Sequence, residues 1–155
     1  MKGRLLLILT ILLFTFSGLQ AQQACLNKAW KAFGEENYED AIKHCDECIE
    51  TFGEAATKMQ SELEAAGNKN GSFPSGVPSE EMKDKIFSNW AVNDVSTAYY
   101  VRGLAAEKHY RATGDKTYKE MAKESFKETC SFPFGRCWDE QGWFWSPCEA
   151  AQEKL

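Results

Sequence analysis

The sequence predicts an all-α fold of antiparallel helical hairpins that ends in an aromatic loop and a short capping helix. Three observations lead to this prediction. From residue 24 onward, apolar residues recur mainly at intervals of three and four, which is the spacing of amphipathic helices. Residues that favour helix ends stand between these segments, and no segment needs to be read as a strand. The 155-residue chain also has six cysteines, an even number that is typical of disulfide bonds in an exported protein.

Residues 1–21 are predicted to form a secretory signal peptide that is removed from the mature protein. Lys2 and Arg4 make the start of the chain basic, and residues 5–16 are apolar apart from two threonines. The short segment that follows, ending at Ala21, suits cleavage by signal peptidase. The protein is therefore expected to be exported, either to a periplasm or to the outside of the cell.

Two alternatives to a cleaved signal peptide remain open. An uncleaved membrane anchor needs an apolar run of roughly 18 residues, and the run at 5–16 is shorter. Lipidation of Cys25 is disfavoured because residues 22–24 are a poor approach to a lipidated cysteine. Cleavage would leave residues 22–155, which is enough for a single domain with one core and no membrane span.

The charge of the chain limits its partners. The net charge is −5, and it becomes more negative once the basic signal peptide is removed. A negative field disfavours contact with nucleic acids and with anionic lipids. Nucleic acid is therefore not expected among the partners of this protein.

The first two helices are predicted to form a hairpin that turns between Glu36 and Asn37. Asn37 is a natural N-cap, and the acidic residues Glu39 and Asp40 favour a helix start in the turn that follows. Because the connection is so short, the two helices must lie antiparallel and cover each other's apolar faces. Gly53 is expected to interrupt the second helix. The apolar face of the first helix is formed by Leu26, Ala29, Trp30 and Phe33, and that of the second by Tyr38, Ala41, Ile42, Cys45, Ile49 and Phe52.

The middle of the chain is predicted to contain a weak third helix over 55–66, a loop and a long helical segment. The loop, residues 67–79, holds three of the eleven glycines and two of the four prolines, so we expect it to be mobile and dispensable for folding. Ser79 can cap the next helix, and Asn93 or Asp94 can restart it. This segment is apolar on more than one face, which predicts a helix packed between neighbours.

The last long helix is expected to follow Gly114 and Asp115, which interrupt the helical pattern. Near the C-terminus, residues 146–149 place serine at an N-cap, proline at the first helical position and glutamate at the third. This arrangement is a capping box, and it predicts a short helix that runs to Leu155. The segment 137–148 is therefore expected to be a loop that joins two helices.

Two segments show a recurring pattern of aromatic and small residues. In segment 36–52 the pattern is made by Tyr38, Ala41, Cys45 and Cys48, and in segment 98–126 by Tyr99, Gly103, Ala122 and Phe126. Both segments resemble tetratricopeptide repeats, and the resemblance covers about half of the mature chain. It implies an array of α-hairpins, and proteins with such arrays generally bind other proteins rather than catalyse reactions.

All six cysteines are candidates for disulfide bonds. Cys45 and Cys48 form a CxxC pattern, which could also indicate a redox pair or half of a metal site. Their position in the middle of a helix and the lack of a matching second pair favour structural disulfides. The two cysteines point along neighbouring sides of one helix, so they are expected to bond to different partners. Cys25 and Cys48 lie at the same distance from the predicted turn, and we expect a disulfide between them.

A second disulfide is predicted between Cys137 and Cys148, where it would close the aromatic loop. The pairing of the two remaining cysteines, Cys45 and Cys130, stays open. Gly142 and Pro147 allow the segment between Cys137 and Cys148 to turn.

The aromatic loop itself contains Trp138, Trp143, Phe144 and Trp145. These side chains either form a lid over the end of the helical stack or an exposed platform for a sugar ring or a partner side chain. The lid is favoured, because a chain of this size needs bulky residues to fill its core. Trp138 and at least one of Trp143 and Trp145 are then expected to be buried. Their expected contact is the helix face that bears Tyr118, Ala122 and Phe126.

No catalytic arrangement is recognised in the sequence. We find no serine, histidine and aspartate pattern, no phosphate-binding glycine loop and no metal signature, so neither enzymatic activity nor a cofactor is expected. The expected function is a non-enzymatic, exported interaction or scaffold module that binds another exported or envelope protein. The alternative is an accessory carbohydrate-binding or carbohydrate-degrading protein that uses the tryptophan-rich loop, with Asp139 and Glu140 beside it.

Overall fold

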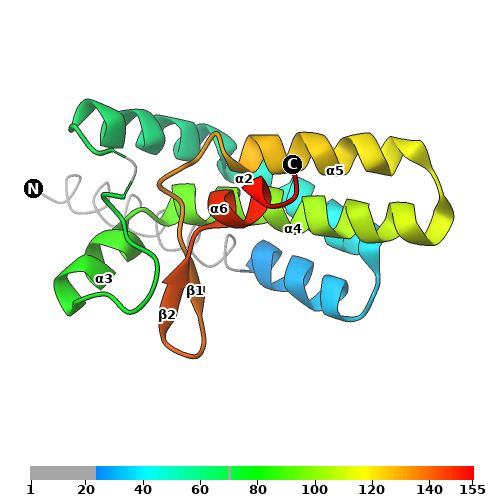
Figure 1. Cartoon of the computed structure of the whole chain (residues 1–155), viewed down its shortest axis with the longest axis horizontal. Helices are drawn as coiled ribbons and strands as arrows, with labels where there is room; N and C mark the ends of the chain where they lie inside the picture. The colour runs from blue at the N-terminus through cyan, green and yellow to red at the C-terminus, as the bar shows by residue number, and fades with distance from the viewer. Residues whose placement is uncertain (1–23, 70) are drawn as a thin grey trace, which may run out of the picture.

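The computed structural model describes residues 24–69 and 71–155. This part of the chain is mostly helical, and it contains one pair of short antiparallel strands (Figure 1). The predicted signal peptide and its cleavage site lie outside the described residues.

The first hairpin consists of a helix over 24–34 and α2 (Tyr38–Ala65). Its turn lies where the sequence predicts it, and the Asn37 side chain accepts a hydrogen bond from the backbone N–H of Asp40 at 3.4 Å. The prediction that Gly53 interrupts this helix is wrong, because α2 continues through it for 28 residues. A single glycine inside a helix costs about 1 kcal/mol. Burial of Phe52 and Ala56 on either side of Gly53 offsets that cost.

The helices α3 (Glu80–Ser88) and α4 (Trp90–Thr113) follow the loop. Ser79 caps α3 as expected, since its hydroxyl accepts the N–H of Met82 at 3.3 Å. The break between the two helices lies at Asn89, and Asn93 and Asp94 are inside α4, so the predicted restart position is wrong. The side chain of Asn93 instead forms two long-range hydrogen bonds. It donates to the carbonyl of Ile86 at 2.7 Å and accepts the N–H of Arg136 at 2.9 Å.

The second hairpin joins α4 to α5 (Lys116–Thr129). Gly114 ends α4 with a φ of 75°, and the Asp115 side chain caps α5 by accepting the N–H of Thr117 at 2.9 Å. At Gly103 a Cβ atom would lie 2.6 Å from the ring of Phe126, so this glycine lets α4 and α5 approach closely.

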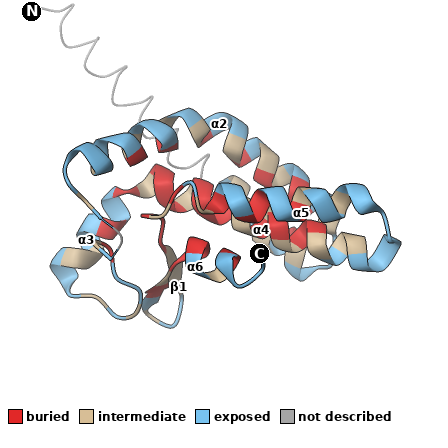
Figure 2. Cartoon of the chain, turned by 45° about the horizontal axis from the view of Figure 1, so that its top comes forward, coloured by how far each residue is buried: buried red, intermediate tan, exposed pale blue. Residues whose placement is uncertain are grey.

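The helix α4 packs against both α2 and α5, and buried residues gather along it, whereas α2 and α5 turn an exposed face outward (Figure 2). The predicted position of this helix between neighbours is therefore confirmed.

The aromatic segment is a β-hairpin, which corrects the expectation of a loop without strands. The strands β1 (Cys137–Asp139) and β2 (Trp143–Trp145) pair in antiparallel register, with Trp138 opposite Phe144. Aromatic residues favour strands, and Gly142, with a φ of 100°, allows the tight connection between them.

The loop 67–79 is tied to this hairpin. Gly76 exchanges two backbone hydrogen bonds with Phe144, at 2.7 and 2.8 Å. Phe73 is only 6% exposed, and its ring centroid lies 5.8 Å from that of Phe134. Phe73 therefore contributes to the core and Gly76 extends the strand pairing, which does not fit the expectation that the whole segment is dispensable.

The short helix α6 (Pro147–Gln152) begins at the predicted capping residue. The Ser146 hydroxyl accepts the N–H of Glu149 at 3.2 Å. The helix ends at Gln152 rather than at Leu155.

Two disulfides are present in the described part of the chain. Cys25 is joined to Cys48, with their Cα atoms 5.7 Å apart, as the symmetry about the first turn predicts. Cys148 is joined to Cys130 and not to Cys137, so the predicted closure of the aromatic segment is wrong. Strand pairing places Cys137 opposite Trp145, whereas the packing of α6 on α5 brings Cys148 to the end of α5. Cys45 and Cys137 are free thiols. Two disulfides are consistent with an oxidising, exported compartment.

Candidate functional site

A cavity of about 730 Å³ lies between the first helix, α3, the first half of α4 and the β-hairpin. In the view of Figure 1, α3, the hairpin and the first helix all lie below α4. We call it the aromatic cavity, because its walls include Trp30, Phe87, Trp90, Trp138 and Phe144. Its volume is within the range of sites that bind small ligands or partner side chains.

The aromatic walls of this cavity are held in place by one another. The ring of Phe144, which is 1% exposed, lies 4.8 Å from that of Trp138 and 5.2 Å from that of Phe87. Trp90 packs edge-on against Phe52 of α2, with ring centroids 6.3 Å apart. The walls are therefore preformed, and binding would cost little side-chain entropy.

The backbone around the cavity is fixed by Asn93. Its two hydrogen bonds join the end of α3 to the residue before β1. The neighbouring Gly135 lies so close to α4 that an added Cβ would be 2.6 Å from the side chain of Ser96. These contacts fix the position of the hairpin relative to α3 and α4.

Asp94 is the carboxylate that lines the aromatic cavity from α4. Among the described residues, none forms a hydrogen bond or an ion pair with its side chain. Burial raises the pKa of Asp94 to about 7. A partly buried carboxylate without a partner is costly to a folded protein, and such groups are frequent at binding sites.

Arg136 lines the same cavity but does not neutralise Asp94. Its guanidinium donates from one Nη to the carbonyls of Pro133 and Gly135, at 3.1 and 2.6 Å, while its Nε has no partner. Burial lowers the pKa of Arg136, and the charge of Glu149 partly offsets that effect. Arg136 therefore holds the segment before β1 in place.

The two free thiols are poor nucleophiles. Burial raises the pKa of Cys137, which lines the aromatic cavity, to about 11, and it raises the pKa of Cys45 further still. Nucleophilic and metal-binding chemistry requires the thiolate. Within residues 24–69 and 71–155, no group of three histidine, cysteine or acidic side chains is placed to hold a metal ion.

The predicted aromatic residues are divided between the two faces of the hairpin. Phe144 is buried, Trp138 and Trp145 are half-buried, and Trp143 is 37% exposed. Residues directly opposite in antiparallel strands share a face, so Trp138 and Phe144 point together toward Phe87 of α3. The expectation that Trp138 packs against α5 is therefore wrong.

Trp145 comes closer to the expected contact. Its ring centroid lies 5.3 Å from that of Tyr100, which in turn lies 6.0 Å from the ring of Phe126. The hairpin thus covers α4 and reaches the predicted face of α5 through Tyr100.

An outer hollow of about 490 Å³ adjoins the aromatic cavity and shares four lining residues with it: Trp30, Cys137, Trp138 and Glu140. Trp145, Asp139 and Gln141 complete its rim. We call the cavity and the hollow together the aromatic groove.

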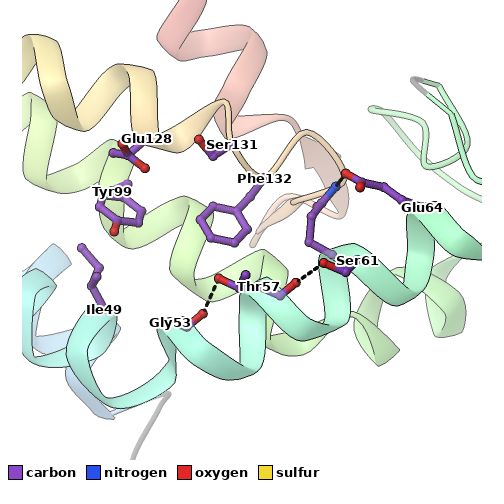
Figure 3. Close-up of a pocket in the computed structure, with 10 residues that line it drawn as sticks. Ile49, Gly53, Thr57, Ser61, Glu64, Tyr99, Glu128, Ser131 and Phe132 are labelled. Atoms are coloured by element: carbon purple, nitrogen blue, oxygen red, sulfur yellow. Dashed lines mark hydrogen bonds between the residues drawn. The ribbon is translucent and has the colours of Figure 1, made fainter.

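A further hollow of about 400 Å³ lies between α2, α4 and the segment after α5 (Figure 3). Two of its hydroxyl groups are used within α2, because Thr57 donates to the carbonyl of Gly53 and Ser61 to that of Thr57. The ring of Phe132 stacks on Tyr99 above them, at 6.2 Å between centroids. Its walls have fewer large aromatic side chains than those of the aromatic groove, because Tyr99 and Phe132 are the two aromatic residues that line it.

Three residues of the groove were assigned by sequence reasoning only to helix faces or a helix start. Trp30 and Trp90 have the spacing of core positions, and Asp94 resembles a helix cap. The signal that could have identified the site is an acidic residue one turn after a tryptophan, inside a helix that is otherwise apolar on several faces.

Comparison with protein-family models, with curated proteins and with solved structures finds no match for this chain. No helix in the described part is both long enough and apolar enough to span a membrane.

Proposed function

We propose that this protein is a non-enzymatic, exported binding module, and that its aromatic groove docks a partner protein from the same compartment. The aromatic groove is the observation that carries this proposal. It combines preformed aromatic walls with an unpaired carboxylate, Asp94, in a volume suited to a side chain of a partner. Aromatic anchors of this kind contribute much of the binding energy at protein interfaces.

Export and a repeat-like architecture belong to the same proposal. The basic and apolar start of the chain and the two disulfides support export. The two helical hairpins, one before the loop and one after it, support an architecture like that of tetratricopeptide repeats. Both features favour a partner that is an exported or envelope protein.

An accessory carbohydrate-binding protein is the second candidate, and the outer hollow favours it. Three tryptophans border this hollow together with Asp139, Glu140 and Gln141. Tryptophan faces can stack on sugar rings, and carboxylates and amides can bond to sugar hydroxyls.

Affinity purification from the native compartment tests the proposal, with the groove altered in two ways. Trp30→Ala removes one aromatic wall, and Glu140→Lys reverses an exposed charge at the rim without disturbing the core. Trp143→Ala is the matched control, because this tryptophan is exposed and lies outside the lining of the groove.

We expect one partner protein to co-purify with the wild type and with Trp143→Ala, and to fall at least tenfold with either groove variant. Tenfold corresponds to about 1.4 kcal/mol of binding free energy. Equal recovery by all four proteins, with unchanged melting temperatures, would refute the groove as the docking surface. Binding of labelled oligosaccharides that is lost in Trp145→Ala would favour the second candidate.

A further inference from the structure

We infer that the aromatic cavity accepts the guanidinium group of an arginine side chain supplied by the partner. This inference rests on the proposed function, since it takes the aromatic groove as the docking surface, and it names the chemistry of what enters the cavity. It is carried by an unpaired carboxylate, by tryptophan walls and by the absence of a neutralising cation at that carboxylate.

The carboxylate is the first argument. Asp94 lies partly buried on α4, between Trp90 one turn before it and Thr97 almost one turn after it, and all three line the cavity. No described side chain pairs with it. A guanidinium group can donate two parallel N–H bonds to one carboxylate, which a single ammonium group cannot do with the same geometry.

The aromatic walls are the second argument. A guanidinium group is planar and weakly hydrated, so it stacks on tryptophan faces at a small desolvation cost. Trp30 and Trp138 supply such faces around the cavity. The Nζ atom of Lys83 already lies 4.9 Å from the centre of the Trp138 ring, which shows that this wall tolerates a cation beside it.

The charges around Asp94 are the third argument. The first helix contributes only Leu26, Asn27 and Trp30 to the lining, so no charge comes from that side. Lys83 of α3 lies over Trp138, and Glu140 in the hairpin turn adds a second negative charge at the rim.

Arg136, just before the hairpin, and Cys137, in its first strand, are the remaining titratable side chains that line the cavity. Arg136 donates to backbone carbonyls and forms no ion pair with Asp94. Cys137 stays protonated and neutral, because burial raises the pKa of its thiol to about 11. A guanidinium group would therefore meet an uncompensated negative charge at Asp94.

A matched pair of small probes tests this inference directly. N-acetyl-arginine amide and N-acetyl-citrulline amide have nearly the same shape, but only the first carries a charge. Their binding to the purified, processed protein is followed by tryptophan fluorescence and by calorimetry at pH 8. For probes of this size we expect a dissociation constant on the order of 1 mM for the arginine form, with at least tenfold weaker binding of the citrulline form.

Two variants test whether the preference for the arginine probe depends on Asp94. Asp94→Asn keeps the shape of the side chain and should abolish the preference, whereas Trp143→Ala should preserve it. For the wild type, affinity for the arginine probe should rise between pH 6 and pH 8, because Asp94 loses its proton over this range and the probe stays charged. Affinity for the citrulline probe should not change.

Each outcome bears on one of the two proposals. Equal binding of both probes to the wild type, or a preference that survives in Asp94→Asn, would overturn the inference. If the partner protein is still lost in the groove variants while the probes show no charge preference, the groove docks a partner by other chemistry. If the probes behave as expected but no partner depends on the groove, the cation site stands and the proposed function fails.

Discussion

Replacing Asp94 by asparagine should stabilise the protein at neutral and alkaline pH. Asp94 has no ion pair or hydrogen bond among the described residues, and burial raises its pKa from 3.8 to about 7. When an acid has a higher pKa in the folded state than in the unfolded state, its ionisation favours unfolding. The free energy of unfolding should therefore fall as the pH rises from about 4 to about 7, and it should then level off.

The size of this effect follows from the shift. About three pKa units at about 1.4 kcal/mol per unit give an upper value of about 4 kcal/mol. Asp94 borders a cavity that water can enter, so we expect a smaller effect of about 2 kcal/mol. Asparagine carries no charge, so the variant should lack this loss of stability.

Urea unfolding at several pH values measures this difference. Urea is chosen because guanidinium chloride would supply the proposed ligand of the cavity. At pH 8, Asp94→Asn should be more stable than the wild type by about 2 kcal/mol, and at pH 4 the two should be equally stable. Asp84→Asn, which removes an exposed acid from α3, is the control and should match the wild type at both pH values. Equal stability of Asp94→Asn and wild type at pH 8 would mean that Asp94 is well solvated or paired, and the reasoning on its charge would fail.

Three further predictions concern the packing of the chain. Gly103→Ala should lower the free energy of unfolding by about 1 to 3 kcal/mol, measured in urea, because its Cβ would lie 2.6 Å from the Phe126 ring; an unchanged midpoint would contradict the close approach of α4 and α5. Limited proteolysis should cut first within residues 67–71. Because Phe73 is buried, Phe73→Ala should lower the free energy of unfolding by about 3 to 5 kcal/mol. A first cut beyond Phe73, or unchanged stability of Phe73→Ala, would show that this part of the loop does not pack against the core. Alkylation followed by peptide mapping without reduction should label Cys137 only after unfolding; rapid labelling of the native protein would mean that the thiol is accessible and reactive.

Local signals in the sequence predicted four of the helix starts, although not that of α4 after Asn89. Asn37, Ser79, Asp115 and Ser146 each accept a backbone N–H within three residues, so neighbouring residues alone determine these caps. The bridge between Cys25 and Cys48 was predictable for a related reason, because the geometry of one short turn places the two cysteines opposite each other.

Features that depend on distant contacts were not predictable in this way. Gly53 stays helical because buried residues on both sides of it pack against the rest of the fold. Cys148 pairs with Cys130 because α6 folds back on α5, a contact that no spacing rule encodes. The aromatic segment forms strands that bond to Gly76, a residue far away in the sequence.

The candidate site depends on distant contacts even more strongly. Trp30, Asp94 and Trp138 come from three separate parts of the chain, and each fits an ordinary structural position on its own. Only their convergence around one cavity distinguishes them from core residues, and convergence is a property of the fold.

The aromatic cavity takes one wall from near the start of the chain and another from near its end, at Trp30 and Phe144. The helical hairpins can form from contacts between neighbouring segments, but the cavity is complete only after the last strand has docked on Gly76 and α3. Contacts of such long range are expected to form late in folding. A newly made chain should therefore pass through a helical state in which Phe144, which is 1% exposed in the folded protein, is still uncovered. In that interval the chain would be most in need of a chaperone.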